Sequence, residues 1–221
     1  MNLVPAFHGR QKAAEVDWDR DLAPRIRAFL DERVDGGRQY NLYLDTHLSI
    51  AYLAGYLLGK GDTVAPVQTE GRVAWRPTGA NVPGELWTVR EELVGDGPGL
   101  ALAVEVTRPT AEDVRIYTAT NAPGIGRMLV LTVAGGTGPT SVRDGSHAWA
   151  LARDLGQIVE GRRTAEERTA PVHVFSSVPV ALEYLVGREG RAFGRSVTYE
   201  FDFDNRTPGG YTPAFHLPMN A

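Results

Sequence analysis

Two short polar stretches follow apolar runs that are typical of buried strands, residues 40–44 and 173–178. The candidate ligand-binding residues there are Asp45, Thr46, His47 and Ser49 in the first stretch, and Ser176, Ser177 and Val178 in the second. Hydroxyl groups and the free N–H groups at a helix start can hold phosphate and ribose oxygens. Asp45 would repel a phosphate, so we expect it to contact a ribose or a base edge. N-capping is the alternative role, because Ser, Thr and Asp cap helices in any protein.

An arginine occupies a comparable position later in the chain. Thr107 and Arg108 follow the apolar run 100–106, where a planar guanidinium with several donors would suit an anion. The alternative is an exposed arginine before Pro109 with no special role. Arg127 and Lys60 are weaker candidates, because each is expected at the opposite, strand-entry edge.

Aromatic side chains near the C-terminus could stack on a base such as adenine. These are Tyr199, Phe201, Tyr211 and Phe215. We expect them mainly to pack against the sheet, with one tyrosine at most, Tyr199, beside a ligand.

Other patterns favour ordinary structural roles. The five histidines have no zinc-ligand spacing, and His173 is predicted to be packed and hydrogen-bonded. The glycine-rich stretch 135–141 lacks the lysine of a nucleoside-triphosphate loop. Asp202 and Asp204 are expected to be strand-end charges. We therefore predict no metal site, no cofactor and no catalytic residue.

The elements that position these residues alternate along the chain. Helices are predicted over 20–34, 48–58, 111–120 and 146–160 and after Pro179, and strands over 40–44, 63–68, 100–106, 128–133, 173–178 and 197–201. Such alternation is typical of an α/β fold with a largely parallel sheet, in which ligands bind beyond the carboxyl ends of the strands. Residues 71–98 hold two alternating apolar segments around a turn, which predicts a hairpin or a small insertion.

The chain contains an internal self-match. Leu42-Tyr43 and Tyr52-Leu53-Ala54-Gly55 align with Val174-Phe175 and Tyr184-Leu185-Val186-Gly187, each 132 residues later. Strand, polar turn, helix and second strand follow in the same order in both copies. If the copies pack around a pseudo-twofold axis, both polar turns face one crevice, which would suit a ligand that itself repeats.

Composition excludes several classes of function. The chain has 221 residues, a net charge of −4 and no cysteine. A negative charge does not favour binding to duplex nucleic acid or to an anionic membrane. Without cysteine there is no disulfide or thiolate site. There is no signal-peptide pattern, and no apolar run approaches the ~20 residues of a membrane helix. We expect a cytoplasmic protein.

These motifs, in their order and spacing, resemble the SAVED domains of bacterial anti-phage signalling. The resemblance lies in Leu44-x-x-His47-Leu48-Ser49-Ile50-Ala51-x-x-x-Gly55, Pro66-Val67-Gln68, Ala103-Val104-Glu105-Val106-Thr107, Asp113-Val114, His147-x-x-x-Leu151-Ala152, His173-Val174-Phe175-x-x-x-Pro179, Tyr199-Glu200-Phe201-Asp202 and Tyr211-x-Pro213-x-x-x-Leu217-Pro218. Together these pieces cover residues 38 to 218.

The resemblance implies two fused Rossmann-like, CARF-like halves with largely parallel sheets and a pseudo-twofold relation. The implied division is an N-terminal lead-in and helix over 1–37, a first half with the hairpin insertion over 38–98 and a second half over 99–221. It further implies a cyclic tri- or tetra-adenylate ligand, made by a nucleotidyltransferase in CBASS or by a CRISPR polymerase.

SAVED domains usually follow an effector domain, which ligand-driven self-association switches on. This sequence carries no such domain, so we expect an excised sensor or a sensor subunit whose effector is a separate chain. The predicted function is a non-enzymatic sensor of cyclic oligoadenylate in anti-phage defence. The alternatives are a ring-nuclease-like enzyme that cleaves its ligand, with His47 as base, and a scaffold subunit with a degenerate pocket.

Overall fold

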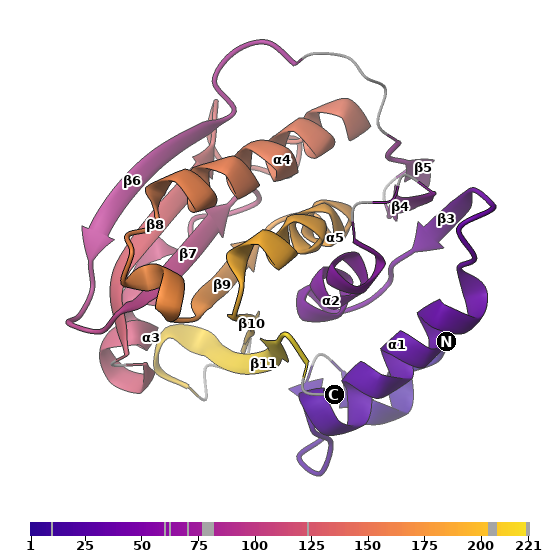
Figure 1. Cartoon of the computed structure of the whole chain (residues 1–221), viewed down its shortest axis with the longest axis horizontal. Helices are drawn as coiled ribbons and strands as arrows, with labels where there is room; N and C mark the ends of the chain where they lie inside the picture. Colours follow the sequence, from indigo (N-terminus) through magenta and orange to yellow (C-terminus); the bar gives the residue numbers. More distant parts are fainter. Residues whose placement is uncertain are drawn as a thin grey trace.

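The computed structural model describes residues 1–9, 11–59, 61, 63–69, 71–76, 82–122, 124–202 and 207–219 (Figure 1). Lys60 and Asp204, both named above, lie outside the described residues. The helices are α1 (Ala23–Arg33), α2 (Leu48–Leu58), α3 (Ala111–Asn121), α4 (Gly145–Arg162) and α5 (Val180–Glu189). The strands are β1 (Phe7–His8), β2 (Gln11–Lys12), β3 (Tyr40–Tyr43), β4 (Val64–Gln68), β5 (Val73–Ala74), β6 (Trp87–Leu93), β7 (Gly99–Glu105), β8 (Ile125–Val133), β9 (Val172–Ser177), β10 (Ser196–Phe201) and β11 (Tyr211–Leu217).

A six-stranded sheet forms the centre of the molecule, in the order β11-β10-β9-β7-β8-β6. Its four inner strands, β10, β9, β7 and β8, are parallel, and the two edge strands are antiparallel to their neighbours. Every residue of β7 is buried, which is why residues 99–104 form a continuous apolar run in the sequence before Glu105. A second sheet holds β3, β4 and β5. The expectation of a mixed α/β fold with a largely parallel sheet is confirmed.

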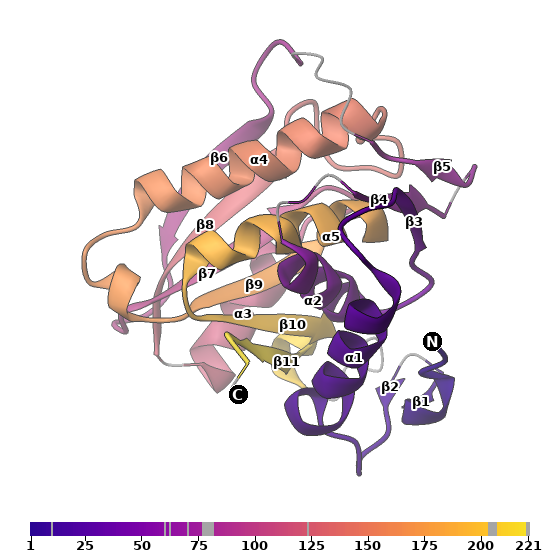
Figure 2. The ribbon, with the colours of Figure 1, turned by 45° about the vertical axis from the view of Figure 1, so that its right-hand side comes forward.

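Helices cover both faces of the central sheet (Figures 1 and 2). Leu102 and Val104 of β7 belong to the core cluster that includes residues of α2, α4 and α5. Ala101 and Ala103, which point to the other face, join a second cluster with Val114 and other residues of α3. Because side chains alternate along a strand, one strand supplies both cores.

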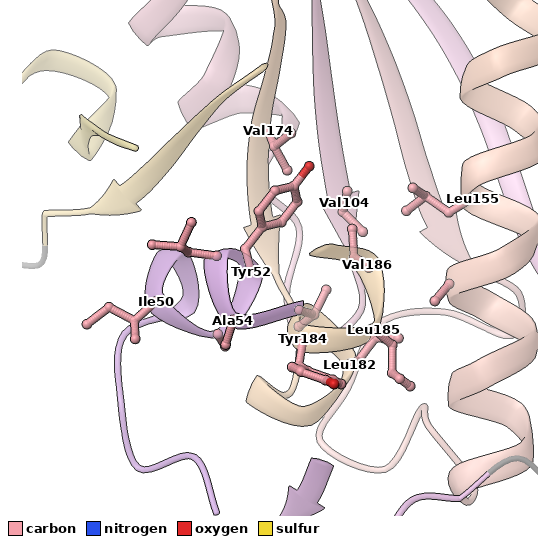
Figure 3. Packing of buried hydrophobic residues seen from close by; sticks show 14 of the residues in the cluster. Ile50, Tyr52, Ala54, Val104, Leu155, Val174, Leu182, Tyr184, Leu185 and Val186 are labelled. Atoms are coloured by element: carbon pink, nitrogen blue, oxygen red, sulfur yellow. The ribbon is translucent and has the colours of Figure 1, made fainter. Parts of the chain in front are cut away.

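Helices α2 and α5 pack closely against each other at the centre of the molecule. A Cβ atom built on Gly55 would lie 1.9 Å from the carbonyl oxygen of Tyr184, and one built on Gly187 would lie 2.1 Å from that of Tyr52. Figure 3 shows both tyrosines in this region, with Tyr52 extending from α2 toward Val174 of β9. Only glycine permits such an approach, so the close packing explains two interior helix glycines that would otherwise be destabilising.

Two β-α-β units share one pairing register. In β3–α2–β4, Tyr40 pairs with Val64 and Leu42 with Pro66. In β9–α5–β10, the residues 132 positions later pair in the same way: Val172 with Ser196 and Val174 with Thr198. The self-match in the sequence therefore corresponds to two units with the same strand–helix–strand order.

Two local predictions differ from the structure. The segments within 71–98 do not form a hairpin with each other, because β5 pairs with β4 whereas β6 pairs with β8 in the central sheet. The indole of Trp87 anchors β6 by donating to the carbonyl oxygen of Leu151 in α4 at 3.0 Å. The helix predicted from residue 20 begins at Ala23, after a π-helical turn over Trp18–Leu22.

Within the described ranges, no helix combines the length and the apolar character needed to cross a membrane.

Candidate functional site

A cavity of 1190 Å³ lies where the carboxyl ends of the parallel strands meet the N-terminal segment. Its lining comes from the N-terminal segment, α1, the β3–α2 turn, the residues after β7 and the ends of β9 and β10. Both β-α-β units therefore line the cavity. The wall at the start of α2, the α2 wall, contains Asp45, Thr46, His47 and Glu200, and the wall at the start of α5, the α5 wall, contains Thr107, Arg108, Ser176, Ser177 and Val178. This is the edge of an open α/β sheet at which ligands bind.

The structure brings nearly all the predicted ligand-binding residues to this cavity. Those that line it are Asp45, Thr46, His47, Thr107, Arg108, Ser176, Ser177, Val178 and Tyr199. Ser49 is not among the lining residues; it is 1% exposed and lies beneath the wall.

On the α5 side, hydroxyl groups tie the ends of two strands together. The Oγ1 atom of Thr107 and the Oγ atom of Ser177 lie 2.6 Å apart, and the backbone N–H of Thr107 donates to the carbonyl oxygen of Ser177 at 2.8 Å. Helix α5 starts after Pro179, whose side chain makes no capping hydrogen bond. These contacts hold Ser177 at the cavity wall beside a helix N-terminus.

A buried carboxyl group lies behind Ser176. The hydroxyl of Ser176 donates to Oε1 of Glu183 at 3.2 Å, and Glu183 is 2% exposed. Burial raises the pKa of Glu183 to about 8, and the nearby charge of Glu200 acts in the same direction. At neutral pH Glu183 is therefore mainly uncharged, and the first turn of α5 carries little negative charge.

Arg108 is held in place but keeps an accessible guanidinium. Its Nη1 atom lies 3.0 Å from Oδ2 of Asp113, and its Cζ atom lies 4.3 Å from the centre of the Phe201 ring. The side chain is 40% exposed. The guanidinium can therefore meet an anion in the cavity while the carboxylate and the ring restrict its orientation.

On the α2 side, an acidic residue that the sequence had not indicated completes the wall. Oε1 of Glu200 accepts a hydrogen bond from the backbone N–H of Ser49 at 2.6 Å, and Oε2 lies 3.4 Å from Nδ1 of His47. The His47 ring stacks on Phe7, with ring centres 4.4 Å apart. Glu200 and Phe7 both line the cavity.

Sequence reasoning missed Glu200 and Phe7 for different reasons. Glu200 contacts a helix start 151 residues earlier, a separation that no local pattern shows. Its position at the carboxyl end of a predicted strand was the one available signal. Phe7 lies in an N-terminal segment without clear periodicity.

Tyr199 serves both packing and the cavity wall. Its ring stacks on Phe175 with centres 4.1 Å apart, and its hydroxyl lies 2.8 Å from Nδ1 of His173. Burial, with a smaller effect of His216, lowers the pKa of His173 to about 4, so His173 is neutral at pH 7. The expectation that His173 is packed and hydrogen-bonded is confirmed. Tyr211 and Phe215 are fully buried and pack the core.

The remaining polar clusters do not belong to this cavity. Arg127 donates to Glu167 and to Glu91, and none of these three lines the cavity. In the part of the chain that the structure describes, no group of three or more His, Cys, Asp or Glu side chains is arranged to hold a metal ion.

A mostly parallel sheet with a cavity at the carboxyl ends of its strands is typical of α/β domains that bind ligands at this edge. Within that class, residues 22–217 match the family model of the SMODS-associated and fused to various effectors sensor domain, SAVED. The chain belongs to this family, and the resemblance seen in the sequence is confirmed.

Among curated proteins, the chain is similar to CD-NTase-associated protein 4 of Enterobacter hormaechei subsp. hoffmannii (strain UCI 50). The two are 33% identical over 221 residues, which are 98% of this chain and 44% of that protein. The chain thus spans less than half the length of this relative.

Solved structures of Cap4 SAVED/CARF-domain containing receptors share the fold. The Acinetobacter baumannii receptor with the cyclic trinucleotide 2′3′3′-cAAA matches with a TM-score of 0.68 and 16% identity, over 89% of this chain and 42% of that chain. The same receptor with 3′3′3′-cAAA gives a TM-score of 0.67 and 16% identity, over 88% and 42%. The Moraxella osloensis receptor gives 0.61 and 11%, over 89% and 41%.

Proposed function

We propose that this SAVED domain binds a cyclic oligoadenylate, a cyclic tri- or tetra-adenylate, in the cavity and acts as a sensor in CBASS anti-phage defence. The observation that carries the proposal is the single cavity formed by the strand ends of both β-α-β units. The relatives support the choice of ligand, since two structures of one similar receptor, that of Acinetobacter baumannii, each hold a cyclic trinucleotide.

The size of the cavity favours a ligand larger than a mononucleotide. Pockets for drug-sized ligands have volumes of roughly 300–1,000 Å³. A cavity of 1190 Å³ is at or above the upper end of that range. A ring of three or four nucleotides would contact both walls at once.

The positive charge and the hydroxyl groups of the cavity lining are suited to binding a few ligand phosphates. Arg108 is the one lysine or arginine among the described lining residues, and the hydroxyl pair of Thr107 and Ser177 lies on the same side. Hydrogen bonds from charged or hydroxyl donors to phosphate are strong when water is excluded. We therefore propose that the phosphates face this side.

We further propose that the two units form CARF-like halves related by a pseudo-twofold axis. The contact between α2 and α5 supports this: Gly55 approaches Tyr184, and Gly187 approaches Tyr52, with equivalent residues 132 positions apart. A twofold contact has this reciprocal form. The boundaries 1–37, 38–98 and 99–221 are part of this proposal, with β6 of the first half joining the sheet of the second half beside β8.

In the cell, we propose that the ligand drives self-association of a cytoplasmic protein and so activates an effector. The curated relative is more than twice as long as the segment that it shares with this chain. That additional length supports an effector on the same or a partner chain. Light scattering with and without ligand would test self-association, and an unchanged mass would refute it.

Calorimetry with a panel of cyclic oligonucleotides tests the binding function. We expect a measurable heat of binding with cyclic tri- or tetra-adenylate. Linear triadenylate should bind more weakly, because it is not held as a ring that contacts both walls. No heat with any member of the panel would refute the sensor and favour the scaffold alternative. The recovered ligand should be intact; cleaved ligand would favour the ring-nuclease alternative.

A further inference from the structure

The carboxylate of Glu200 occupies the N-terminus of α2 within the cavity wall. Oε1 accepts the N–H of Ser49 at 2.6 Å, and Oε2 lies 3.4 Å from Nδ1 of His47. The Glu200 side chain is 15% exposed and lines the cavity. It is therefore both a helix cap and part of the ligand-facing surface.

This arrangement changes what the α2 wall can bind. A helix N-terminus favours an anion because its free N–H groups and its dipole both present positive charge. Here a carboxylate from β10 already takes that position. A ligand phosphate at the same place would lose the N–H donor of Ser49 and would meet a like charge.

The α5 wall has different chemistry at the equivalent place. The residue 132 positions before Glu200, at the end of β4, is Gln68, which is uncharged. The acidic residue in the first turn of α5 is Glu183, whose pKa burial raises to about 8. Arg108 and the Thr107–Ser177 hydroxyl pair lie on that side. Phosphates are thus favoured at one wall and disfavoured at the other.

Glu200 retains acceptor capacity after these contacts. An ionised carboxylate has about four lone-pair positions and no donor. The contacts with Ser49 and His47 use one position on each oxygen. The unused lone-pair positions of Glu200 can only accept a hydrogen bond from a donor. An oligoadenylate offers two kinds of neutral donor, the exocyclic amino group of adenine and the ribose hydroxyl.

We infer that Glu200 is a specificity-determining residue that accepts a hydrogen bond from a neutral donor of the ligand, a base amino group or a ribose hydroxyl, and so turns the phosphates toward Arg108. The inference rests on the proposed function and deepens it. It assigns the α2 wall to bases or sugars and the α5 wall to phosphates.

Glu200→Gln tests this role with little change of shape. The amide oxygen can still accept the N–H of Ser49, so α2 keeps its cap, whereas the second oxygen becomes a donor. We expect the Kd for cyclic tri-adenylate to rise roughly tenfold to a hundredfold, the range for a hydrogen bond to a charged group. The melting temperature of the variant reports whether the cap is preserved.

Glu105→Gln is the matched control. Oε1 of Glu105 accepts the N–H groups of Thr110 at 2.7 Å and Ala111 at 2.8 Å at the start of α3, and the residue is 3% exposed. It caps a helix at the same edge of the sheet but does not line the cavity. Its Oε2 also accepts the hydroxyl of Thr132 at 2.7 Å, which an amide nitrogen cannot do, so we expect Glu105→Gln to lower stability and to leave the affinity of the folded protein unchanged.

Two ligand analogues identify the donor. Cyclic tri-inosinate lacks the amino group, and a 2′-deoxy cyclic tri-adenylate lacks the hydroxyl. The wild-type protein should bind one of them more weakly, and Glu200→Gln should show no further loss with that analogue. Affinity for cyclic tri-adenylate that is unchanged or increased in Glu200→Gln would overturn the inference. If the wild-type protein bound no cyclic oligonucleotide, the proposed function itself would fail.

Discussion

The two β-α-β units of this domain share a backbone and differ in the chemistry of their helix starts. The N-cap residues, His47 of α2 and Pro179 of α5, have φ and ψ angles of −64° and 150° and of −58° and 140°. A carboxylate from β10 caps α2, whereas α5 begins after Pro179, whose side chain makes no capping hydrogen bond. The same backbone therefore carries two helix starts of different charge, because a few side chains differ between the units.

The helix glycines offer the strongest test of the likeness between the units. A methyl group at Gly55 or at Gly187 would lie about 2 Å from a backbone oxygen of the other helix, so α2 and α5 would have to separate. We expect Gly55→Ala and Gly187→Ala each to lower the free energy of unfolding by about 3 kcal/mol, as overpacked cores do. Denaturant titration measures the loss.

Gly161→Ala in α4 is the control for these two variants, because a Cβ there meets nothing within 4 Å. It should be neutral or stabilise the protein by up to about 1 kcal/mol. A loss in only one of the two glycine variants would contradict the reciprocal contact.

Glu183 provides the clearest difference between the helices, because its counterpart 132 residues earlier is Ala51. The folded protein keeps a proton on Glu183 up to a pKa of about 8, whereas the unfolded chain loses it near the ordinary value of 4.5. The free energy of unfolding should therefore fall as pH rises across this window, by an amount on the order of a few kcal/mol. Urea titrations at pH 5, 7 and 9 measure this slope.

Glu183→Gln, which cannot ionise, should flatten that dependence, whereas Glu160→Gln on the exposed side of α4 should keep the wild-type slope. Equal slopes in the wild-type protein and Glu183→Gln would show that Glu183 is ionised in the folded state.

Arg108 sharpens the assignment of phosphates to the α5 wall. Arg108→Ala should raise the Kd for the cyclic ligand roughly tenfold to a hundredfold, since a charged donor to phosphate is lost. The fold should be retained, because a half-exposed ion pair such as Arg108–Asp113 contributes little to stability. Calorimetry measures the affinity, with Arg153→Ala, an exposed arginine of α4, as the control. Undiminished affinity would remove Arg108 from the site.

The hydroxyl pair at the ends of β7 and β9 gives the smallest effect. Thr107→Val and Ser177→Ala remove the two partners of a 2.6 Å contact. A double-mutant cycle should give a coupling energy of about 1 kcal/mol in the free energy of unfolding. Asp45, the exposed counterpart of Ser177, should change stability by less than about 0.5 kcal/mol when replaced by alanine. Additive effects of Thr107→Val and Ser177→Ala would show that the hydroxyls do not interact.

Local sequence patterns predicted the elements of this fold well. The apolar run at β7 and the stop of α2 before Gly59 left little choice of boundary, because burial and helix termination act over a few residues. The edge strand β6 was different: its partner β8 lies more than 30 residues away, and only tertiary packing selects it over a hairpin. In the site, residues that follow strands could be predicted from the topology. Glu200 could not, since its partner is set by how β10 packs on α2.

The contact between α2 and α5 has one more consequence. Side chains in a wall can be exchanged for larger or smaller ones, but glycine has no smaller replacement, and the atoms opposite Gly55 and Gly187 are backbone. The helices therefore cannot come closer. To fit a wider or narrower form of the proposed cyclic ligand, substitutions would have to occur in the turns and the N-terminal segment, while the spacing of the two helices stays the same.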